Sequence, residues 1–334
     1  MKRALSSVAA IIATSALALA GCASGTTDTT SSAGSAAAGD SSYSIGIAEY
    51  VSHPSLDSSV EGFKEAIEAA GLDVTYDEQN SQGDQATGTA IASKFAGQDL
   101  DLVLAVATPI AQAMAQSVTS IPVLFTAVTD PVAAELVDSN EAPGANLTGT
   151  TDMNPVADQI DLIKKLNPEA KTFGIIYSSG EVNSEVQVKL AREEAAAQGL
   201  EVVEKTITNS SEVLQAAQAL GDVDAIYVPT DNMVVSALDS VLQAAEAAQI
   251  PVVVGESDSV AKGGVITYGL NYKELGKQTG EMAVKILTEG ADPATMAVES
   301  QKNPQLVINT AAAARMGVTV PQELLDQADQ VIKQ

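Results

Sequence analysis

The sequence contains one cysteine, one histidine and no tryptophan among its 334 residues. A single cysteine cannot form an intramolecular disulfide, and one cysteine with one histidine cannot build a zinc cluster. A catalytic site that needs histidine would have to use His53 alone. We therefore expect no metal, no cofactor and no catalytic residues.

Basic residues are also scarce. The chain has 17 Lys and Arg against 43 Asp and Glu, which gives a formal net charge of −26. So acidic a surface repels phosphate backbones, and we expect no nucleic-acid partner. The acidic residues are dispersed along the chain, as is typical of a solvated protein surface. The length suffices for two domains with separate cores.

The first 22 residues carry a targeting pattern. Lys2 and Arg3 precede an apolar stretch from residue 8 to residue 20, which is too short to span a bilayer comfortably. The stretch ends in Leu-Ala-Gly-Cys at residues 19–22. This pattern resembles the bacterial lipoprotein signal. It implies a signal peptide over residues 1–21, cleavage before Cys22, and a diacylglyceryl group with acyl chains such as palmitate on the Cys22 thiol.

Residues 22–42 are expected to form a flexible linker behind this lipid anchor. They consist almost entirely of Ser, Thr, Ala and Gly, with Asp28 and Asp40 as the charged residues. Such a segment cannot bury enough apolar surface to fold. We expect the folded part to begin near Tyr43, on the extracytoplasmic side of the cell membrane, with the lipid as its membrane attachment.

From Tyr43 onward, short apolar runs alternate with helical patterns. The runs are almost continuously apolar, as in a parallel sheet that helices cover on both faces. This alternation predicts right-handed βαβ units. The predicted strands include residues 44–50, 72–79, 101–108 and 121–128, and the predicted helices include residues 56–70, 84–96 and 109–118.

The same order of segments then returns further along the chain. Residues 173–181 repeat the pattern of residues 45–53, and residues 199–202 repeat residues 71–74, both at an offset of 128. We therefore predict an α/β fold with two Rossmann-like open parallel-sheet lobes. Because ligands bind beyond the carboxyl ends of parallel strands, two such lobes facing each other would hold a ligand in the cleft between them.

Seven segments follow one another in an order that points to a family: among them "HPSLDSSVEGFKEAIEAAG" from residue 53, "FTAVTDPVAAELV" from residue 125 and "YVPTDNMVVSAL" from residue 227. Over nearly all of residues 43–315, the chain resembles the bacterial ABC-transporter substrate-binding lipoproteins related to tryptophan- and tyrosine-binding proteins. The resemblance implies a type I periplasmic-binding-protein fold with three crossovers between the lobes. It also implies a permease and an ATPase as partners.

By this resemblance, lobe 1 comprises residues 43–150 and 271–300, and lobe 2 comprises residues 151–270 and 301–334. The crossovers would fall near residues 150–151, 270–271 and 299–302. One position departs from the family pattern, because Glu49 stands where the family often has Gln. An acid at this position can alter which ligand is accepted.

An amino-acid ligand presents a carboxylate and an ammonium group. The N–H groups of a helix N-terminus suit the carboxylate, and Ala107 and Thr108 open a predicted helix, with Thr108 either as its cap or as a ligand contact. The candidates for the ammonium are acids at strand ends: Asp130, Asp231, and Glu256 or Asp258. Asp231 has helix capping as its alternative role, and Asp130 has the shaping of a turn.

The remaining candidates gather at the same strand ends. Tyrosines would form the walls of the side-chain pocket, although a tyrosine there also packs in the core. Hydroxyl and amide side chains after residue 177 would donate hydrogen bonds or cap the next helix, and His53 would shape the loop before the first helix. The full predicted set comprises Glu49, Tyr50, Ala107, Thr108, Thr129, Asp130, Tyr177, Ser178, Ser179, Asn183, Thr230, Asp231, Asn232, Glu256 and Tyr268.

We predict a monomeric solute receptor of an ABC importer that closes two lobes around a small amino-acid-like ligand, with an aromatic side chain. A nucleoside or another small polar solute is the alternative ligand, and delivery to a sensor is the alternative to import. An enzyme would need an acid–base pair among Asp130, Asp231 and Glu256. The sequence has neither a nucleophile elbow nor a phosphate loop, so we expect no enzymatic activity.

Overall fold

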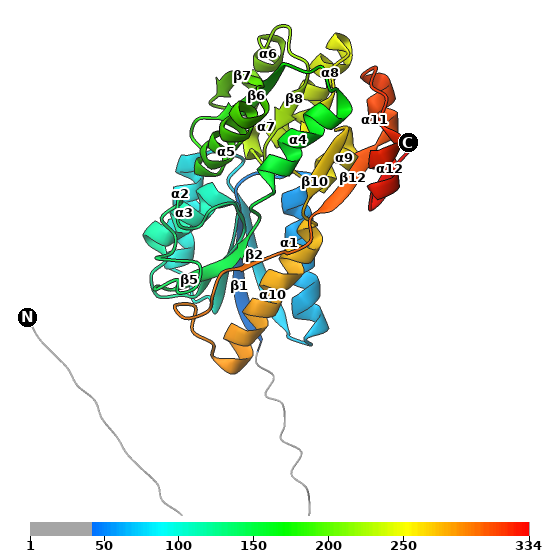
Figure 1. Ribbon diagram of the computed structural model, residues 1–334. Helices are drawn as coiled ribbons and strands as arrows, with labels where there is room; N and C mark the ends of the chain where they lie inside the picture. The colour runs from blue at the N-terminus through cyan, green and yellow to red at the C-terminus, as the bar shows by residue number, and fades with distance from the viewer. Residues whose placement is uncertain (1–41, 334) are drawn as a thin grey trace, which may run out of the picture. The chain divides into compact units, whose positions relative to one another are not determined.

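A computed structural model describes residues 42–333 of the chain (Figure 1). The predicted signal peptide, Cys22 and the linker up to residue 41 lie outside the described residues. Within residues 42–333, no helix combines the length and the apolar character that crossing a membrane requires.

The first sheet has six strands in the order β11-β5-β4-β3-β1-β2, and all neighbouring pairs are parallel. Every residue of β3 and β4 is buried, as expected for central strands with helices on both faces. We call this sheet and its helices lobe 1. Its elements are β1 (Tyr43–Glu49), α1 (Pro54–Ala69), β2 (Val74–Asn80), α2 (Gln85–Ala96), β3 (Leu102–Val106), α3 (Thr108–Ser117), β4 (Val123–Val128), β5 (Leu147–Thr151), α10 (Tyr272–Glu289) and β11 (Glu299–Ser300).

The second sheet has seven strands in the order β13-β12-β10-β9-β8-β6-β7 and belongs to lobe 2. Its strands are β6 (Thr172–Ser178), β7 (Glu201–Ile207), β8 (Ile226–Val228), β9 (Val252–Val254), β10 (Ile266–Gly269), β12 (Gln305–Asn309) and β13 (Gln330–Ile332). Its helices are α4 (Val156–Leu166), α5 (Val182–Gln198), η1 (Ser210–Glu212), α6 (Val213–Gln218), α7 (Asn232–Ser236), α8 (Leu238–Ala248), α9 (Ser257–Lys262), α11 (Thr310–Arg315) and α12 (Gln322–Gln327).

The two sheets share one strand order. In lobe 1 the strands run β2-β1-β3-β4-β5, and in lobe 2 they run β7-β6-β8-β9-β10. The repeat at an offset of 128 residues therefore corresponds to a structural repeat, with β1, α1 and β2 matching β6, α5 and β7. The predicted fold class of two open α/β lobes is confirmed.

The chain passes between the sheets three times: after β5, after β10 and between β11 and β12. Hydrogen bonds join these crossovers. The Tyr272 hydroxyl at the start of α10 donates to Asp152 Oδ2 over 2.5 Å, and the Gln301 side-chain amide donates to the Asn271 carbonyl over 2.7 Å. The three connections therefore form one hydrogen-bonded strip between the lobes.

One pair in the second sheet is antiparallel, where β12 lies beside β10. The chain leaves lobe 2 at the end of β10 and returns from lobe 1 into β12 without a helix of its own in between. Because it re-enters the sheet at the edge where β10 left, β12 runs in the opposite direction. The other neighbouring strands of this sheet are parallel.

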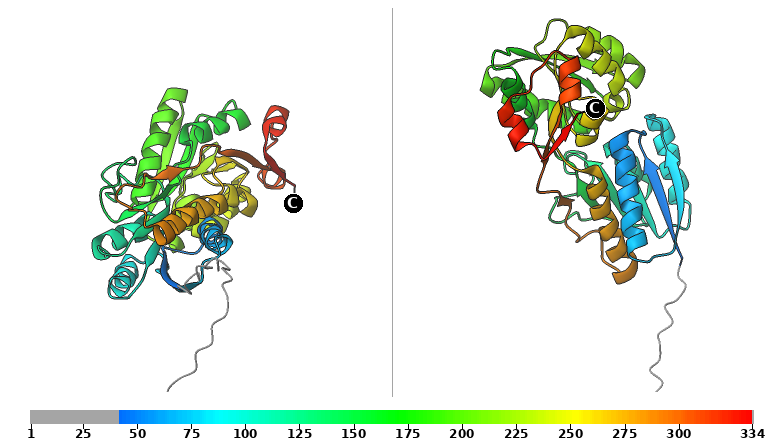
Figure 2. Two further views of the ribbon diagram at one scale, coloured as in Figure 1. Left: turned by 90° about the horizontal axis from the view of Figure 1, so that it is seen from below. Right: turned by 90° about the vertical axis from the view of Figure 1, so that its right-hand side faces the viewer.

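Helix α10 comes from a distant part of the sequence but packs along α1 in lobe 1, as both figures show (Figures 1 and 2). Glycines let the two backbones approach closely. A Cβ built on Gly276 would lie 1.9 Å from the Ser59 carbonyl oxygen, and one built on Gly62 would lie 2.0 Å from the Lys273 carbonyl oxygen. This contact fixes the segment after the second crossover to lobe 1.

Gly276→Ala should lower the free energy of unfolding by on the order of 2 kcal/mol, because the added methyl group would push α1 and α10 apart. Gly97→Ala is a suitable control, since its added Cβ would meet no atom closer than 3.6 Å. Urea denaturation of both variants measures the difference. Wild-type stability of Gly276→Ala would contradict the close helix contact.

Candidate functional site

The lobes contact each other where strands of both sheets end. His53 Nε2, in the turn between β1 and α1, lies 3.5 Å from Asn232 Oδ1 at the start of α7. The Gln187 side-chain amide of α5 lies 3.5 Å from Thr129 Oγ1, which follows β4. These contacts join lobe 1 to lobe 2, and we call the region around them the interlobe interface.

Buried polar atoms without a hydrogen-bond partner occur on both sides of this interface. Lobe 1 contributes His53 Nδ1, Ser55 Oγ and Thr108 Oγ1, and lobe 2 contributes Asn183 Oδ1 and Ser257 Oγ. Within residues 42–333, no protein atom bonds to them. They lie at the first turns of α1, α3, α5 and α9, each of which follows a strand of a parallel sheet. Because buried polar groups are almost always paired, this arrangement indicates a polar ligand.

The start of α3 differs from the prediction that Thr108 caps the helix. Ala107 takes the N-cap position, with φ 85° and ψ 156°, and Thr108 is the first helical residue. A positive φ is costly for a residue with a Cβ and is found mainly at functional sites. The turn leaves the Thr108 hydroxyl buried without a partner, beside the N–H groups that every helix start leaves unpaired.

Asp231 fulfils the capping role that the sequence left open. Its Oδ1 accepts a hydrogen bond from Val234 N over 2.8 Å, and its Oδ2 accepts from Ser178 N over 2.5 Å and from Ser184 Oγ over 2.6 Å. All three donors belong to lobe 2, and the side chain is fully buried. Thr230 is likewise held within lobe 2, because Gln187 Nε2 donates to its Oγ1 over 2.5 Å. Asp231 therefore needs no ligand to satisfy its charge.

Asp130 also takes its alternative role. Its Oδ1 accepts hydrogen bonds from Val132 N and Ala133 N, which shapes the turn after β4. The neighbouring Thr129 donates from its hydroxyl to Asp152 Oδ1 over 3.0 Å and thereby contacts the crossover strip.

Glu256 remains as a buried acid at the interface. It occupies the N-cap position of α9 and is 1% exposed. Its Oε1 accepts a hydrogen bond from Ser259 Oγ over 2.7 Å, and the hydrogen bonds found for it within the described residues involve this oxygen. Burial raises the pKa of the Glu256 carboxyl to about 7.

Glu181 is a site residue that sequence reasoning missed. It is 1% exposed and accepts hydrogen bonds from Asn232 Nδ2 over 2.5 Å, Asn183 Nδ2 over 3.0 Å and Met233 N over 3.2 Å. Burial, with Asp231 nearby, raises the pKa of Glu181 to about 8. The repeat offset contained the signal, because residue 181 is the counterpart of His53.

The predicted tyrosines are held within their own lobes. The Tyr50 hydroxyl donates to the Gly83 carbonyl over 3.0 Å, and the Tyr177 hydroxyl donates to Glu204 Oε2 over 3.2 Å. Tyr268 is partly buried at the end of β10, with Lys165 Nζ 5.9 Å from its ring centre. Ser179 is exposed and donates its N–H to the Ile207 carbonyl. The structure does not bring the Tyr177 hydroxyl to the interface, because it bonds toward β7.

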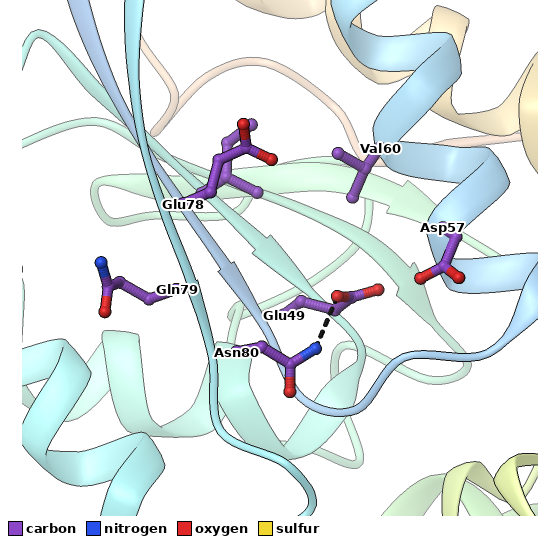
Figure 3. A pocket seen from close by; sticks show the side chains of 7 residues that line it. Glu49, Asp57, Val60, Glu78, Gln79 and Asn80 are labelled. Atoms are coloured by element: carbon purple, nitrogen blue, oxygen red, sulfur yellow. Dashed lines mark hydrogen bonds between the residues drawn. The ribbon is translucent and has the colours of Figure 1, made fainter.

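Glu49 lies in a separate pocket of about 350 Å³ in lobe 1 (Figure 3). All seven residues that line the pocket come from β1, β2 and α1. Glu49 Oε2 accepts a hydrogen bond from Asn80 Nδ2 over 2.7 Å, and burial next to Asp57 raises the pKa of Glu49 to about 8. Successive strand residues point to opposite faces, so Glu49 and Tyr50 cannot face the same site. The structure therefore separates Glu49 from the other predicted residues.

No three His, Cys, Asp or Glu side chains within residues 42–333 lie together in a way that could hold a metal ion. The polar groups at the interface are instead hydroxyls, amides, one imidazole and buried carboxyls. Such groups bind a small organic solute through hydrogen bonds and charge pairs.

Two open α/β lobes, three crossovers and polar helix starts that face each other define a type I periplasmic binding protein. A structure from Bacillus halodurans with bound myo-inositol shares this fold, with 16% identity and a TM-score of 0.59 over 85% of this chain and 96% of that one. The sequence profile of the ABC transporter substrate binding proteins matches residues 44–332, and the chain belongs to this family.

Three relatives are more similar in sequence. The tyrosine-binding protein of Clostridioides difficile (strain R20291) is 42% identical over 270 residues, which cover 79% of this chain and 78% of that protein. An ABC domain from Streptococcus pneumonia in complex with L-Trp is 35% identical, with a TM-score of 0.84 over 87% of this chain and all of that one. A ligand-free, open binding protein from Clostridium difficile is 42% identical, with a TM-score of 0.65 over the same shares.

Glu256→Gln should change how stability depends on pH. The raised pKa means that the folded protein keeps the Glu256 proton to higher pH than the unfolded chain, so this contribution is complete below pH 4.5 and is lost as the pH rises through 7. The variant does not titrate there. Relative to wild type, it should gain on the order of 2 kcal/mol between pH 4.5 and pH 7.5.

Urea unfolding of the ligand-free proteins at these two pH values measures this gain. Asp258→Asn, on the same helix, controls for the loss of one negative charge near α9. A difference between Glu256→Gln and wild type that stays constant over the interval would contradict the assignment.

Proposed function

We propose that this substrate-binding protein holds an aromatic amino acid at the interlobe interface for an ABC importer, and that it has no enzymatic activity. The observation that carries the proposal is the set of buried, unpartnered polar atoms that both lobes present there. The names of two relatives support the ligand class, because one is a tyrosine-binding protein and the other was crystallised with L-Trp.

The start of α3 would bind the ligand carboxylate. The Thr108 hydroxyl is buried without a partner, and the helix dipole together with the first-turn N–H groups favours an anion. The unusual backbone of Ala107 turns the chain sharply from β3 into α3. An α-carboxylate there would satisfy the hydroxyl and the N–H groups at once.

Glu256 would accept the ligand ammonium group. Of the acids predicted for this role, Asp231 and Asp130 are engaged by donors of their own lobes, whereas the bonds found for Glu256 use one oxygen. A carboxyl whose pKa burial has raised becomes ionised again when a cation binds beside it, because the opposite charge favours the ionised form.

Closure of the lobes would complete the site. This structure has a TM-score of 0.84 with the L-Trp complex and 0.65 with the ligand-free, open relative, although the open relative is the more identical in sequence. The difference supports a closed arrangement here. The hydrogen-bonded crossover strip would act as the hinge, as in domain closure around a ligand.

We also propose that the mature protein begins at Cys22, whose lipid holds a monomer on the extracytoplasmic side of the cell membrane. The basic residues, the apolar stretch and the Leu-Ala-Gly-Cys sequence at residues 19–22 support this anchor. The linker would let the folded lobes reach a permease, which an ATPase drives from the other side.

Isothermal titration calorimetry should show saturable binding of L-tryptophan or L-tyrosine. Thr108→Val should weaken this binding roughly ten- to hundredfold, because a hydrogen bond to a charged group contributes about 1.5–3 kcal/mol. Thr288→Val, an exposed change on α10, is the control and should bind like wild type. Binding of a nucleoside with no response to any amino acid would overturn the ligand assignment.

Cys22→Ala should release the protein from the cell membrane, because it removes the thiol that takes the lipid. Membrane fractionation followed by immunoblotting measures the distribution. Since Cys22 is the only cysteine, labelling with radioactive palmitate should also disappear. Unchanged fractionation and labelling would refute the anchor.

A further inference from the structure

The single histidine of the chain forms a buried bridge between the lobes that the proposed ligand contacts do not use. His53 is 5% exposed and belongs to lobe 1, whereas Asn232 and Glu181 are similarly buried and belong to lobe 2. His53 Nε2 lies 3.5 Å from Asn232 Oδ1, and Asn232 Nδ2 donates to Glu181 Oε2 over 2.5 Å. We call these three side chains the His53 bridge.

Glu181 determines which way the bridge is polarised. Because the Asn232 amide nitrogen donates to the Glu181 carboxyl, its oxygen is the atom left for His53. The imidazole must therefore donate from Nε2, which leaves Nδ1 without a proton in the neutral ring. Nδ1 is buried and has no partner within the described residues, so a proton on it would be buried without an acceptor.

From this geometry we propose that the His53 bridge is a proton-sensitive lock on lobe closure: neutral His53 holds the closed lobes together, and protonation of His53 opens them and releases the ligand. The proposal rests on the proposed function, because it concerns the site between the same lobes. It adds a regulatory residue that does not bind the carboxylate or the ammonium of the ligand.

The groups around His53 agree with a neutral ring in the closed form. Burial lowers the pKa of His53 to about 4, Lys262 on α9 lowers it further, and Asp57 on α1 partly opposes this effect. Glu181 on α5 and Asp231 on α7 also face this region, and Glu256 and Asp258 lie at the start of α9. The pKa values of Glu181 and Glu256 are raised by burial, so their own titration acts in the opposite direction and must be separated from that of His53.

The effect of pH on affinity follows from this difference. In open lobes an exposed imidazole takes up its proton near pH 6.5. At pH 5.5 about nine-tenths of the open form would be protonated, and closing would require that proton to leave. Affinity for an aromatic amino acid should therefore be roughly tenfold weaker at pH 5.5 than at pH 7.5. The free amino acid keeps both of its charges over this interval.

His53→Gln separates the histidine from the carboxyls. The glutamine amide can still donate to Asn232 Oδ1 but does not titrate, while Glu181 and Glu256 remain. Calorimetry with L-tryptophan at pH 5.5 and pH 7.5 should show the tenfold acid loss in wild type and its absence in His53→Gln. An equal loss in both proteins, or no loss in wild type, would overturn the proposal.

A second measurement does not depend on the ligand. Gln85 Nε2 of lobe 1 lies 3.5 Å from the Gly180 carbonyl of lobe 2, so a short bis-maleimide can bridge the variant Cys22→Ala, Gln85→Cys, Gly180→Cys in the closed form. Because His53 is the only histidine, its imidazole ¹³C signal titrates alone in NMR spectra of untagged protein.

The cross-linked protein should show a His53 pKa at least one unit below that of the same protein without cross-linker. Equal pKa values in the two samples would overturn the lock, even if aromatic amino acids bind. Absence of amino-acid binding at pH 7.5 together with a lowered pKa in the cross-linked sample would instead contradict the proposed function and leave the lock supported.

Discussion

The constraint on which this structure depends is the need to pair buried polar groups at the place where two parallel sheets end. Parallel strands send their carboxyl ends, and the N-termini of the following helices, to one edge of each lobe. When two such edges meet, hydroxyls, amides and carboxyls leave water together. Most of them find partners in their own lobe, as Asp231 and Thr230 do. The few that do not, such as Thr108 Oγ1 and Asn183 Oδ1, define where a ligand has to bind.

This constraint also links binding to motion. The crossover strip holds the lobes together on one side through Asp152 and Tyr272, while the helix starts meet on the other. A ligand that pairs with both lobes stabilises the closed form by its contacts to each. Asp152 bonds to Thr129 and Tyr272, so the strip is tied to the end of β4 and to α10. Closure can therefore occur about a few hydrogen-bonded residues while each sheet stays intact.

Much of the fold could be predicted from the sequence, since long apolar strands and a repeat at 128 residues determine sheet order in both lobes. The site was less predictable. A Thr-Asp-Asn sequence at a helix start suits capping and ligand binding equally, and hydrogen bonds from distant residues decided the role of Asp231. The positive φ of Ala107 leaves no mark in its residue type. Glu181 was missed because its partners, Asn232 and Met233, lie about fifty residues away.

The account's central claim is that the two lobes close around an aromatic amino acid, and small-angle X-ray scattering tests it most directly. The radius of gyration of the folded chain should decrease when L-tryptophan is added at a concentration that saturates binding. Addition of an amino acid that does not bind should leave it unchanged. A radius of gyration that is the same with and without saturating L-tryptophan would contradict the claim.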